Sequence, residues 1–182
     1  MMLDLKGRQL MQTVAQLSQN TNGNLIVPTD LKPEGVAQIS ESLSLLLADV
    51  FALYLKTKSF HWHIGGPHFR DYHLLLDEQA AQIFAMSDDI AERTRKIGGS
   101  TLRSISDISR HQRLRDSNDA SLSATDMLAE LCSDSRQLTG FLRLTHEVAS
   151  GNNDVATASL IENWIDESER RTWFLSAALH ES

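Results

Sequence analysis

The chain has 182 residues, of which 41% are hydrophobic and 23% are charged. That length fits one folded domain, and the composition excludes a disordered or collagen-like chain. The formal net charge of −7 disfavours nonspecific attraction to phosphate backbones and anionic lipid, and favours cations as ligands. Cys132 is the one cysteine, so neither an intrachain disulfide nor a cysteine-based zinc cluster can form, which fits a reducing cytoplasm. We expect neither an export signal nor a membrane span, because no apolar run approaches about 20 residues.

The chain divides into a partly flexible N-terminal tail, residues 1–31, and a helical domain, residues 32–182. The tail has weak helical periodicity and ends in a turn-rich segment. From Pro33, apolar residues recur at the three-four spacing of an amphipathic helix that runs to about His63. A Gly-Gly-Pro turn at residues 65–67 ends this helix.

A second helix is predicted from about His68 to Ile97, where paired glycines follow. The next segment, residues 100–122, is polar and long enough to cross the length of a helical bundle. A short helix is predicted within it, around residues 105–114.

Two more long helices are predicted in the C-terminal part of the chain. Ser123, followed by an acid three residues later, resembles an N-cap that opens the third helix, which ends near Gly151. Asn152, Asn153 or Asp154 can cap the fourth, which continues to the C-terminus. Four long helices without strand-like alternation predict an all-α four-helix bundle, with a short extra helix in the crossover between the second and third.

A polar stripe follows the second helix. At about 100° per residue, His73, Asp77, Asp88 and Glu92 lie within about 100° on one face. His61 stands across the turn at a matching height, and a His with an Asp four residues on is a typical pair of metal ligands. For the acids alone, the solvated face of an amphipathic helix is the competing interpretation.

The spacing of the stripe points to a pair of chains. The pairs His73/Asp77 and Asp88/Glu92 are about 22 Å apart along the axis, too far to surround one ion. Positions 73 and 92, and likewise positions 77 and 88, share a midpoint between residues 82 and 83. Two antiparallel copies about a two-fold axis there bring Asp77 level with Asp88 of the partner, and His73 level with Glu92 of the partner. Each shared site then has three ligands from one chain and two from its partner: His61, His73 and Asp77, with Asp88 and Glu92.

Two imidazoles and three carboxylates form a nitrogen and oxygen ligand set without a thiolate. Such a set suits Fe(II), Mn(II) or Zn(II) better than Ca(II) or Cu(I). Carboxylates stabilise the higher charge of Fe(III), so they make bound Fe(II) easier to oxidise. The residues therefore favour a redox iron site over a structural zinc site.

The residues around this cluster resemble the Dps family of ferritin-like mini-ferritins. The stretch FHWHIGGPHFRDYHLLLDEQ, residues 60–79, is similar to the family's His-Trp, Gly-Pro, Phe and His-x-x-x-Asp signature. DDIAERTRKIGG, residues 88–99, is similar to its Asp-x-x-x-Glu-Arg segment closing on paired glycines. The resemblance extends from about residue 31 to residue 180. It implies a ferritin-like fold whose inter-subunit ferroxidase ligands fall on the same five residues: His61, His73, Asp77, Asp88 and Glu92.

The resemblance also implies a function. It implies a cytoplasmic, hollow homo-dodecamer that binds Fe(II) at two-fold interfaces, oxidises it preferentially with hydrogen peroxide and stores the ferric oxide, which protects DNA. Trp62 resembles the family's site-adjacent tryptophan, with a buried bundle aromatic as an equal alternative. Lys58, one turn before His61, is interpreted as a solvated lysine in preference to a residue of the site.

The remaining candidate residues are given structural interpretations. His63 and His68 flank the turn and are expected at the surface of the hairpin, and Trp164 and Trp173 are expected in the core. An acidic iron-entry pore is not predicted from the three acids at the start of the fourth helix, because Ala158 interrupts their spacing: Asp154, Glu162 and Asp166.

Two other functions compete with iron oxidation. A nucleoid protein that compacts DNA is disfavoured, because residues 1–33 hold three bases, Lys6, Arg8 and Lys32, against two acids. Direct DNA binding is therefore expected to be weak or absent. A helical scaffold with an incidental polar stripe predicts no stoichiometric Fe(II) uptake.

Overall fold

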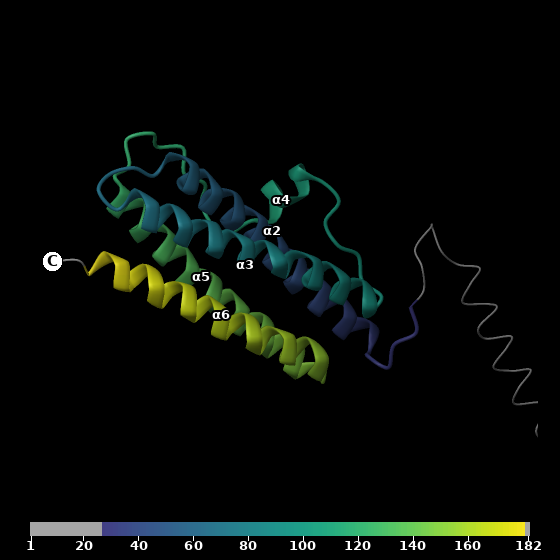
Figure 1. Ribbon diagram of the computed structural model, residues 1–182. Helices are drawn as coiled ribbons and strands as arrows, with labels where there is room; N and C mark the ends of the chain where they lie inside the picture. The colour runs from purple at the N-terminus through teal and green to yellow at the C-terminus, as the bar shows by residue number, and fades with distance from the viewer. Residues whose placement is uncertain (1–26, 181–182) are drawn as a thin grey trace, which may run out of the picture.

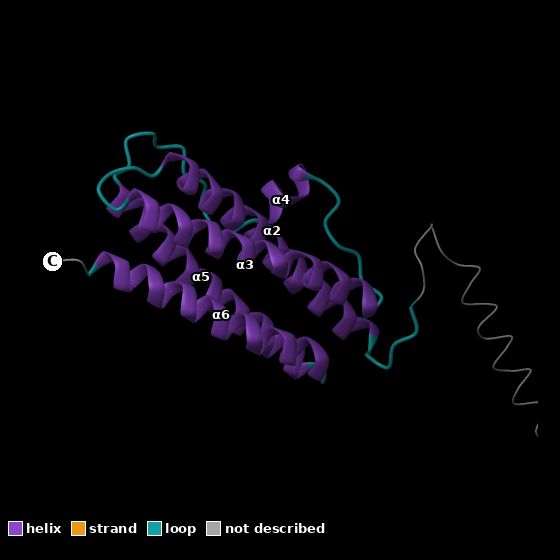
Figure 2. Cartoon of the chain, in the orientation of Figure 1, coloured by secondary structure: helices purple, strands orange, loops and turns teal. Residues whose placement is uncertain are grey.

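The computed structural model describes residues 27–180, and these residues form a bundle of helices. The helices, in chain order, are α2 (Pro33–His63), α3 (Phe69–Lys96), α4 (Ile105–His111), α5 (Ala124–Gly151) and α6 (Val155–Leu179). Figure 1 shows α2 and α3 as one pair and α5 and α6 as a second pair, with the short α4 in the crossover. The described part of the chain contains no strand (Figure 2). The predicted all-α bundle with an extra crossover helix is confirmed.

The predicted N-terminal tail lies mostly outside the described residues. Residues 27–32 enter α2 without forming a helix, and the rest of the segment 1–31 precedes the described part of the chain. The last two residues of the predicted domain, 181–182, also lie outside it.

The helix starts follow the capping chemistry of the sequence. Pro33 occupies the first turn of α2, where its missing N–H removes no helical hydrogen bond. Ser123 and Asp126 form a reciprocal capping box at α5. Asp154, one of three candidate caps, accepts a hydrogen bond from the backbone N–H of Thr157 and begins α6.

Glycines end the first two long helices. Gly66 and Gly98 have φ values of +103° and +90°, a left-handed conformation that glycine adopts without steric cost. At Gly99 a Cβ atom would lie 2.0 Å from Ser40 Oγ, so only glycine allows α2 and the end of α3 to approach this closely. The turns therefore set the packing of the α2–α3 pair.

Apolar side chains from all four long helices fill the bundle. Fully buried examples include Leu46 on α2, Ile83 on α3, Leu138 on α5 and Ile161 on α6. By length and composition α2 also passes as a helix able to cross a membrane, a weak signal that the core helix of a soluble protein produces as well. Half of its most apolar stretch is buried inside the bundle.

A buried carboxylate anchors the crossover. Asp49 of α2 is 0% exposed and accepts hydrogen bonds from the backbone N–H groups of Arg113 and Leu114, at 2.6 and 3.1 Å. The Arg113 guanidinium donates to the other carboxylate oxygen at 2.6 and 2.8 Å. The crossover is thus fixed along α2 by one acid.

Candidate metal centre

The end of α2 and the start of α3 bring two imidazoles together. His61 and His73 stack with ring centroids 3.7 Å apart and planes 20° from parallel. Nδ1 of each ring lies 2.8 Å from the backbone carbonyl oxygen of the other residue. Because a carbonyl oxygen only accepts, each Nδ1 must carry a proton, which leaves the Nε2 lone pair of each neutral ring free to bind a metal.

Asp77, one turn after His73 on α3, lies near the same pair of imidazoles. Its Oδ1 lies 3.9 Å from His61 Nε2 and accepts a hydrogen bond from Lys58 Nζ at 2.7 Å. The Lys58 hydrogen bond and charge lower the pKa of Asp77 below its usual value, so the carboxylate is ionised and ready to bind a cation. The solvated interpretation of Lys58 is wrong, because its side chain is 19% exposed and paired with Asp77. In the sequence, the spacing of one helical turn between Lys58 and His61 already indicated that Lys58 lies close to the candidate site.

Asp88 and Glu92 lie farther along α3 and do not join this cluster within the chain. Both side chains are exposed on the outer face of the helix. Glu92 pairs with Lys96 at 2.8 Å, and that contact lowers the pKa of Glu92. Within residues 27–180 of a single chain, no group of three or more His, Cys, Asp or Glu residues is arranged to hold a metal ion.

The neighbouring aromatic and histidine residues divide into surface and core. Trp62 is 60% exposed, so it is not a buried bundle aromatic. His63 and His68 are exposed at the hairpin, as predicted. Trp164 is 5% exposed and belongs to the core, whereas the prediction for Trp173 is wrong, since it is 67% exposed. The position of Trp173 on α6 places its side chain on the outside of the bundle.

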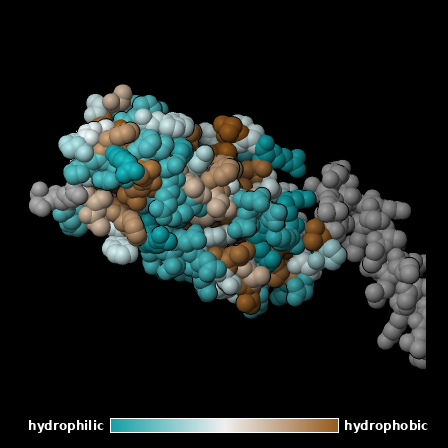
Figure 3. All heavy atoms as spheres, in the orientation of Figure 1, coloured by the Kyte–Doolittle hydropathy of each residue, from teal (hydrophilic) through white to brown (hydrophobic). Residues whose placement is uncertain are grey.

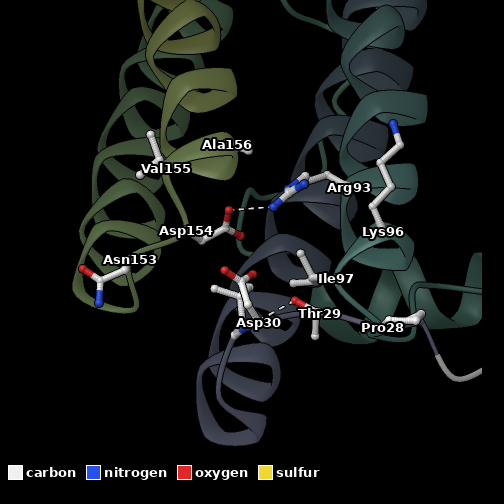
Figure 4. A pocket seen from close by; sticks show the side chains of 11 residues that line it. Pro28, Thr29, Asp30, Arg93, Lys96, Ile97, Asn153, Asp154, Val155 and Ala156 are labelled. Atoms are coloured by element: carbon white, nitrogen blue, oxygen red, sulfur yellow. Dashed lines mark hydrogen bonds and ion pairs between the residues drawn. The ribbon is translucent and has the colours of Figure 1, made fainter. Parts of the chain in front are cut away.

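The acids near the start of α6 have other surroundings. Asp154 is 3% exposed and accepts hydrogen bonds from Arg93 at 2.6 Å and Thr157 Oγ1 at 2.5 Å. Figure 4 shows Arg93 reaching Asp154 across a depression of about 580 Å³ between the end of α3 and the start of α6. This acid therefore has a structural role as cap and ion-pair partner, while Glu162 and Asp166 are exposed.

Apolar side chains are exposed on the outer face of α2, α3 and α4. Figure 3 shows this apolar surface, in brown and tan, over α4 and the neighbouring part of the bundle. A groove of about 650 Å³ runs between α2 and the crossover. Its apolar lining includes Phe51, Tyr54, Leu55, Trp62, Ile105 and Ile108.

Comparison with known proteins relates this arrangement to a family. Residues 40–182 match the family model of the ferritin-like domain. DNA protection during starvation protein 1 of Deinococcus radiodurans is 30% identical over 158 residues, which cover 87% of this chain and 76% of that protein.

Solved structures give the same relationship. The Dps structure from Thermosynechococcus elongatus superposes with a TM-score of 0.79 and 28% identity, over 82% of this chain and 94% of that one. The Dps protein of Vibrio cholerae, described as a member of a superfamily of ferritin-like diiron-carboxylate proteins, has a TM-score of 0.79 over 86% of this chain and 99% of that one. At 24% identity this second likeness shows the fold alone. From its helices, its sequence and its structural relatives, the chain belongs to the Dps family of ferritin-like proteins.

Proposed function

We propose that this protein oxidises Fe(II) and stores the ferric product, at centres that two chains complete together. The observation that carries the proposal is the stacked His61–His73 pair, in which both Nε2 atoms are free and that of His61 lies 3.9 Å from the ionised Asp77. Three ligands are too few to neutralise and enclose an iron ion. Asp88 and Glu92, on the same helix, are the residues that we assign to complete the centre of the neighbouring chain.

The surface of α3 supports an antiparallel pairing of two chains. Around the midpoint at residues 82–83, Ala81 and Ala85 are exposed, and small side chains allow two helices to approach closely. Phe84 is 49% exposed and packs against Tyr54 of α2 at a centroid distance of 4.8 Å. A two-fold contact here would cover these residues and bring Asp77 of one chain level with Asp88 of its partner.

The crossover supports the same contact. Ile105 on α4 is 80% exposed and borders the apolar groove along α2. In a monomer, Ile105 and the groove leave apolar surface exposed to solvent, and a second copy of the chain would bury it. We propose that the α4 regions of two copies cover each other's grooves.

A second apolar surface lies on α6, on a helix other than those of the proposed dimer contact. Trp173 and Phe174 are 67% and 38% exposed and touch each other edge to face. An isologous contact alone closes at a dimer, so a hollow shell needs a further, heterologous contact. We propose that this surface links dimers into the homo-dodecamer implied by the family resemblance.

The ligand chemistry accounts for the proposed reaction. Imidazole and carboxylate ligands accept Fe(II), and the carboxylates lower the energy of Fe(III) relative to Fe(II). With hydrogen peroxide as the oxidant, each of two Fe(II) ions loses one electron, and the peroxide takes up two protons and leaves as two water molecules. DNA is then protected chemically, because both precursors of hydroxyl radical are consumed, and the net charge of −7 disfavours direct DNA binding. A cytoplasmic location agrees with the single cysteine.

Subunit mixing tests the shared centre. Fe(II) is titrated anaerobically, peroxide is added, and ferric absorbance is recorded for the wild type, His61→Ala and Glu92→Ala. Each variant alone should lose oxidation. When the two are dissociated and reassociated together, half of the dimers are mixed and each of these holds one intact centre of two, so about a quarter of wild-type activity should return.

His63→Ala is the matched control, because His63 is an exposed neighbour whose Nδ1 contacts Ser59 O instead. It should oxidise iron like the wild type. Absence of any recovery, with subunit exchange demonstrated by mass spectrometry, would falsify the shared centre.

A further inference from the structure

One carboxylate oxygen of the candidate centre faces both a lysine and an imidazole. Lys58 Nζ donates a hydrogen bond to Asp77 Oδ1 at 2.7 Å, and the same Oδ1 lies 3.9 Å from His61 Nε2. Bonds from a divalent transition-metal ion to nitrogen and oxygen ligands are about 2.0–2.2 Å long, so one ion can bind two atoms up to about 4.2 Å apart. The oxygen that can share a metal ion with His61 is therefore the one that Lys58 already contacts.

The surroundings of Lys58 give this contact more weight than an ordinary surface ion pair has. The side chain of Lys58 is 19% exposed, although that of Asp77 is 56% exposed. The hydrogen bond from Lys58 and its charge are the two largest causes that lower the pKa of Asp77. An ammonium group at this distance repels a divalent cation that approaches the same oxygen, and it has no lone pair with which to bind the cation. Lys58 is therefore a competitor of the metal ion and not one of its ligands.

A second carboxylate assigned to the centre has the same kind of partner. Lys96 Nζ lies 2.8 Å from Glu92 Oε2, one turn farther along α3. Both side chains are well exposed, at 60% and 55%, so solvent and salt screen this pair more than the pair at Lys58. Two of the three assigned carboxylates thus have a lysine of their own chain as counterion.

These lysines change the charge that an entering metal ion meets. In one chain, two neutral imidazoles and the Asp77 carboxylate lie beside Lys58, and the formal charge of this group is zero. In the proposed shared centre, three carboxylates and two ammonium groups leave one negative charge. A single chain therefore attracts divalent cations weakly, and the completed centre attracts them less strongly than its carboxylates alone would.

We propose that Lys58 is a displaceable counterion of the iron centre, which keeps the affinity for divalent metal low and leaves Asp77 Oδ1 when the ion binds. Lys96 acts on Glu92 in the same way, with a smaller effect. The inference rests on the proposed shared iron centre and adds to it a residue outside the ligand set. A moderate affinity suits storage, because the iron has to leave the centre again after oxidation.

Cobalt(II) binding to the full-length protein tests the proposal, because Co(II) takes similar ligands and needs no oxidant. Isothermal titration calorimetry measures the affinity, and binding that is lost in His61→Ala is assigned to the centre. Lys58→Met should bind Co(II) about tenfold more tightly than the wild type, because the competing charge is removed and the aliphatic stem stays. Lys96→Met should gain about twofold. Lys58→Arg, which keeps the charge, should stay within about twofold of the wild type.

Lys32→Met is the matched control, because it removes the same charge from an exposed position before α2, about 40 Å along the helix from Lys58. It should leave the Co(II) affinity unchanged. Two results overturn the inference in distinguishable ways. If the wild type has no Co(II) binding that His61→Ala removes, the proposed centre itself fails. If that binding is present and Lys58→Met binds no more tightly than the wild type, the centre stands and the counterion role of Lys58 fails.

A crystal structure with bound Co(II) supplies a measurement that does not depend on affinity. An anomalous difference peak beside His61 Nε2 and Asp77 Oδ1, with Lys58 Nζ moved beyond hydrogen-bond distance of that oxygen, supports displacement. The same peak with Lys58 still donating to Asp77 Oδ1 would overturn it.

Discussion

Charged groups inside the bundle and charged groups on the outer face of α3 differ in the partners that their own chain provides. Asp49, fully buried, has four hydrogen bonds from two consecutive residues of its own chain. Asp88, exposed on α3, has no ion pair within residues 27–180. The buried acid Asp49 is fully partnered within its own chain, whereas Asp88 is exposed on α3, where we propose that a cation and a second subunit complete it. Arg171 is the interior exception, because its buried guanidinium has no carboxylate partner among residues 27–180.

The largest expected effect comes from breaking an interior pair. Asp49→Ala leaves the Arg113 guanidinium and two backbone N–H groups without their acceptor. The free energy of unfolding should fall by about 3–5 kcal/mol, as measured by urea denaturation. The control is Glu169→Ala, which removes the exposed pair with Arg143 and should cost less than about 1 kcal/mol. Equal losses for the two variants would contradict the contrast between interior and surface.

The acids on α3 should behave in the opposite way. Asp88→Asn should slow Fe(II) oxidation by about a hundredfold, since it removes a proposed ligand, and should change the free energy of unfolding by less than about 0.5 kcal/mol. Stopped-flow absorbance after addition of peroxide measures the rate. Asp89→Asn is a sharp control, because Asp89 is the adjacent exposed acid, about 100° away around the helix. If both variants oxidise iron at the same rate, Asp88 is not a ligand.

The contact between chains should be intermediate in effect. Ile105→Asp places a charge at the apolar crossover surface and should weaken subunit association about tenfold, a loss of about 1.4 kcal/mol. Sedimentation velocity across a dilution series measures this change. Iron oxidation should fall at low protein concentration and recover at high concentration. Loss of oxidation without a change in association would instead place Ile105 in the iron centre itself.

The smallest effect should come from Asp134, a buried acid whose ionised form is disfavoured by burial. Burial raises the pKa of Asp134 above its usual value, against the opposing attraction of Lys56. The folded state therefore binds a proton more readily than the unfolded state. Protonation of Asp134 therefore stabilises the folded state relative to the unfolded state. This stabilisation is fully present below the unfolded pKa of 3.8 and is lost as pH rises through the higher pKa of the folded state.

Asp134→Asn, which mimics the protonated acid, tests this sign. It should change the free energy of unfolding by less than about 1 kcal/mol at neutral pH, and it should cost more near about pH 4 than at neutral pH. Urea titrations at both pH values measure the difference. A cost that grows toward neutral pH would mean that the Lys56 pair outweighs burial.

The helices of this protein could be predicted from local chemistry. Pro33 at the start of α2, Ser123 before α5 and the glycines after α3 gave the correct bounds to within one or two residues. Helix capping and glycine conformation depend on a few neighbouring atoms, so they can be predicted from the local sequence alone. The alignment of the polar stripe on one exposed face of α3 followed from helical periodicity in the same way.

Contacts between distant segments could not be predicted in this way. The mutual hydrogen bonds of His61 and His73, the pairing of Lys58 with Asp77 and the outward position of Trp173 depend on how helices rotate against each other. Periodicity places a residue on a helix face, but it does not state which face a neighbouring helix covers.

Within residues 27–180, the sequence by itself determined the order and ends of the long helices, and the residues available as ligands. Only the tertiary structure decided that both imidazoles have a free Nε2 atom, that Asp49 fastens the crossover and that Arg171 is buried without a carboxylate. The physical reason is range. Helix formation is governed by hydrogen bonds across four residues, whereas the solvation and partners of a charged group depend on segments tens of residues away.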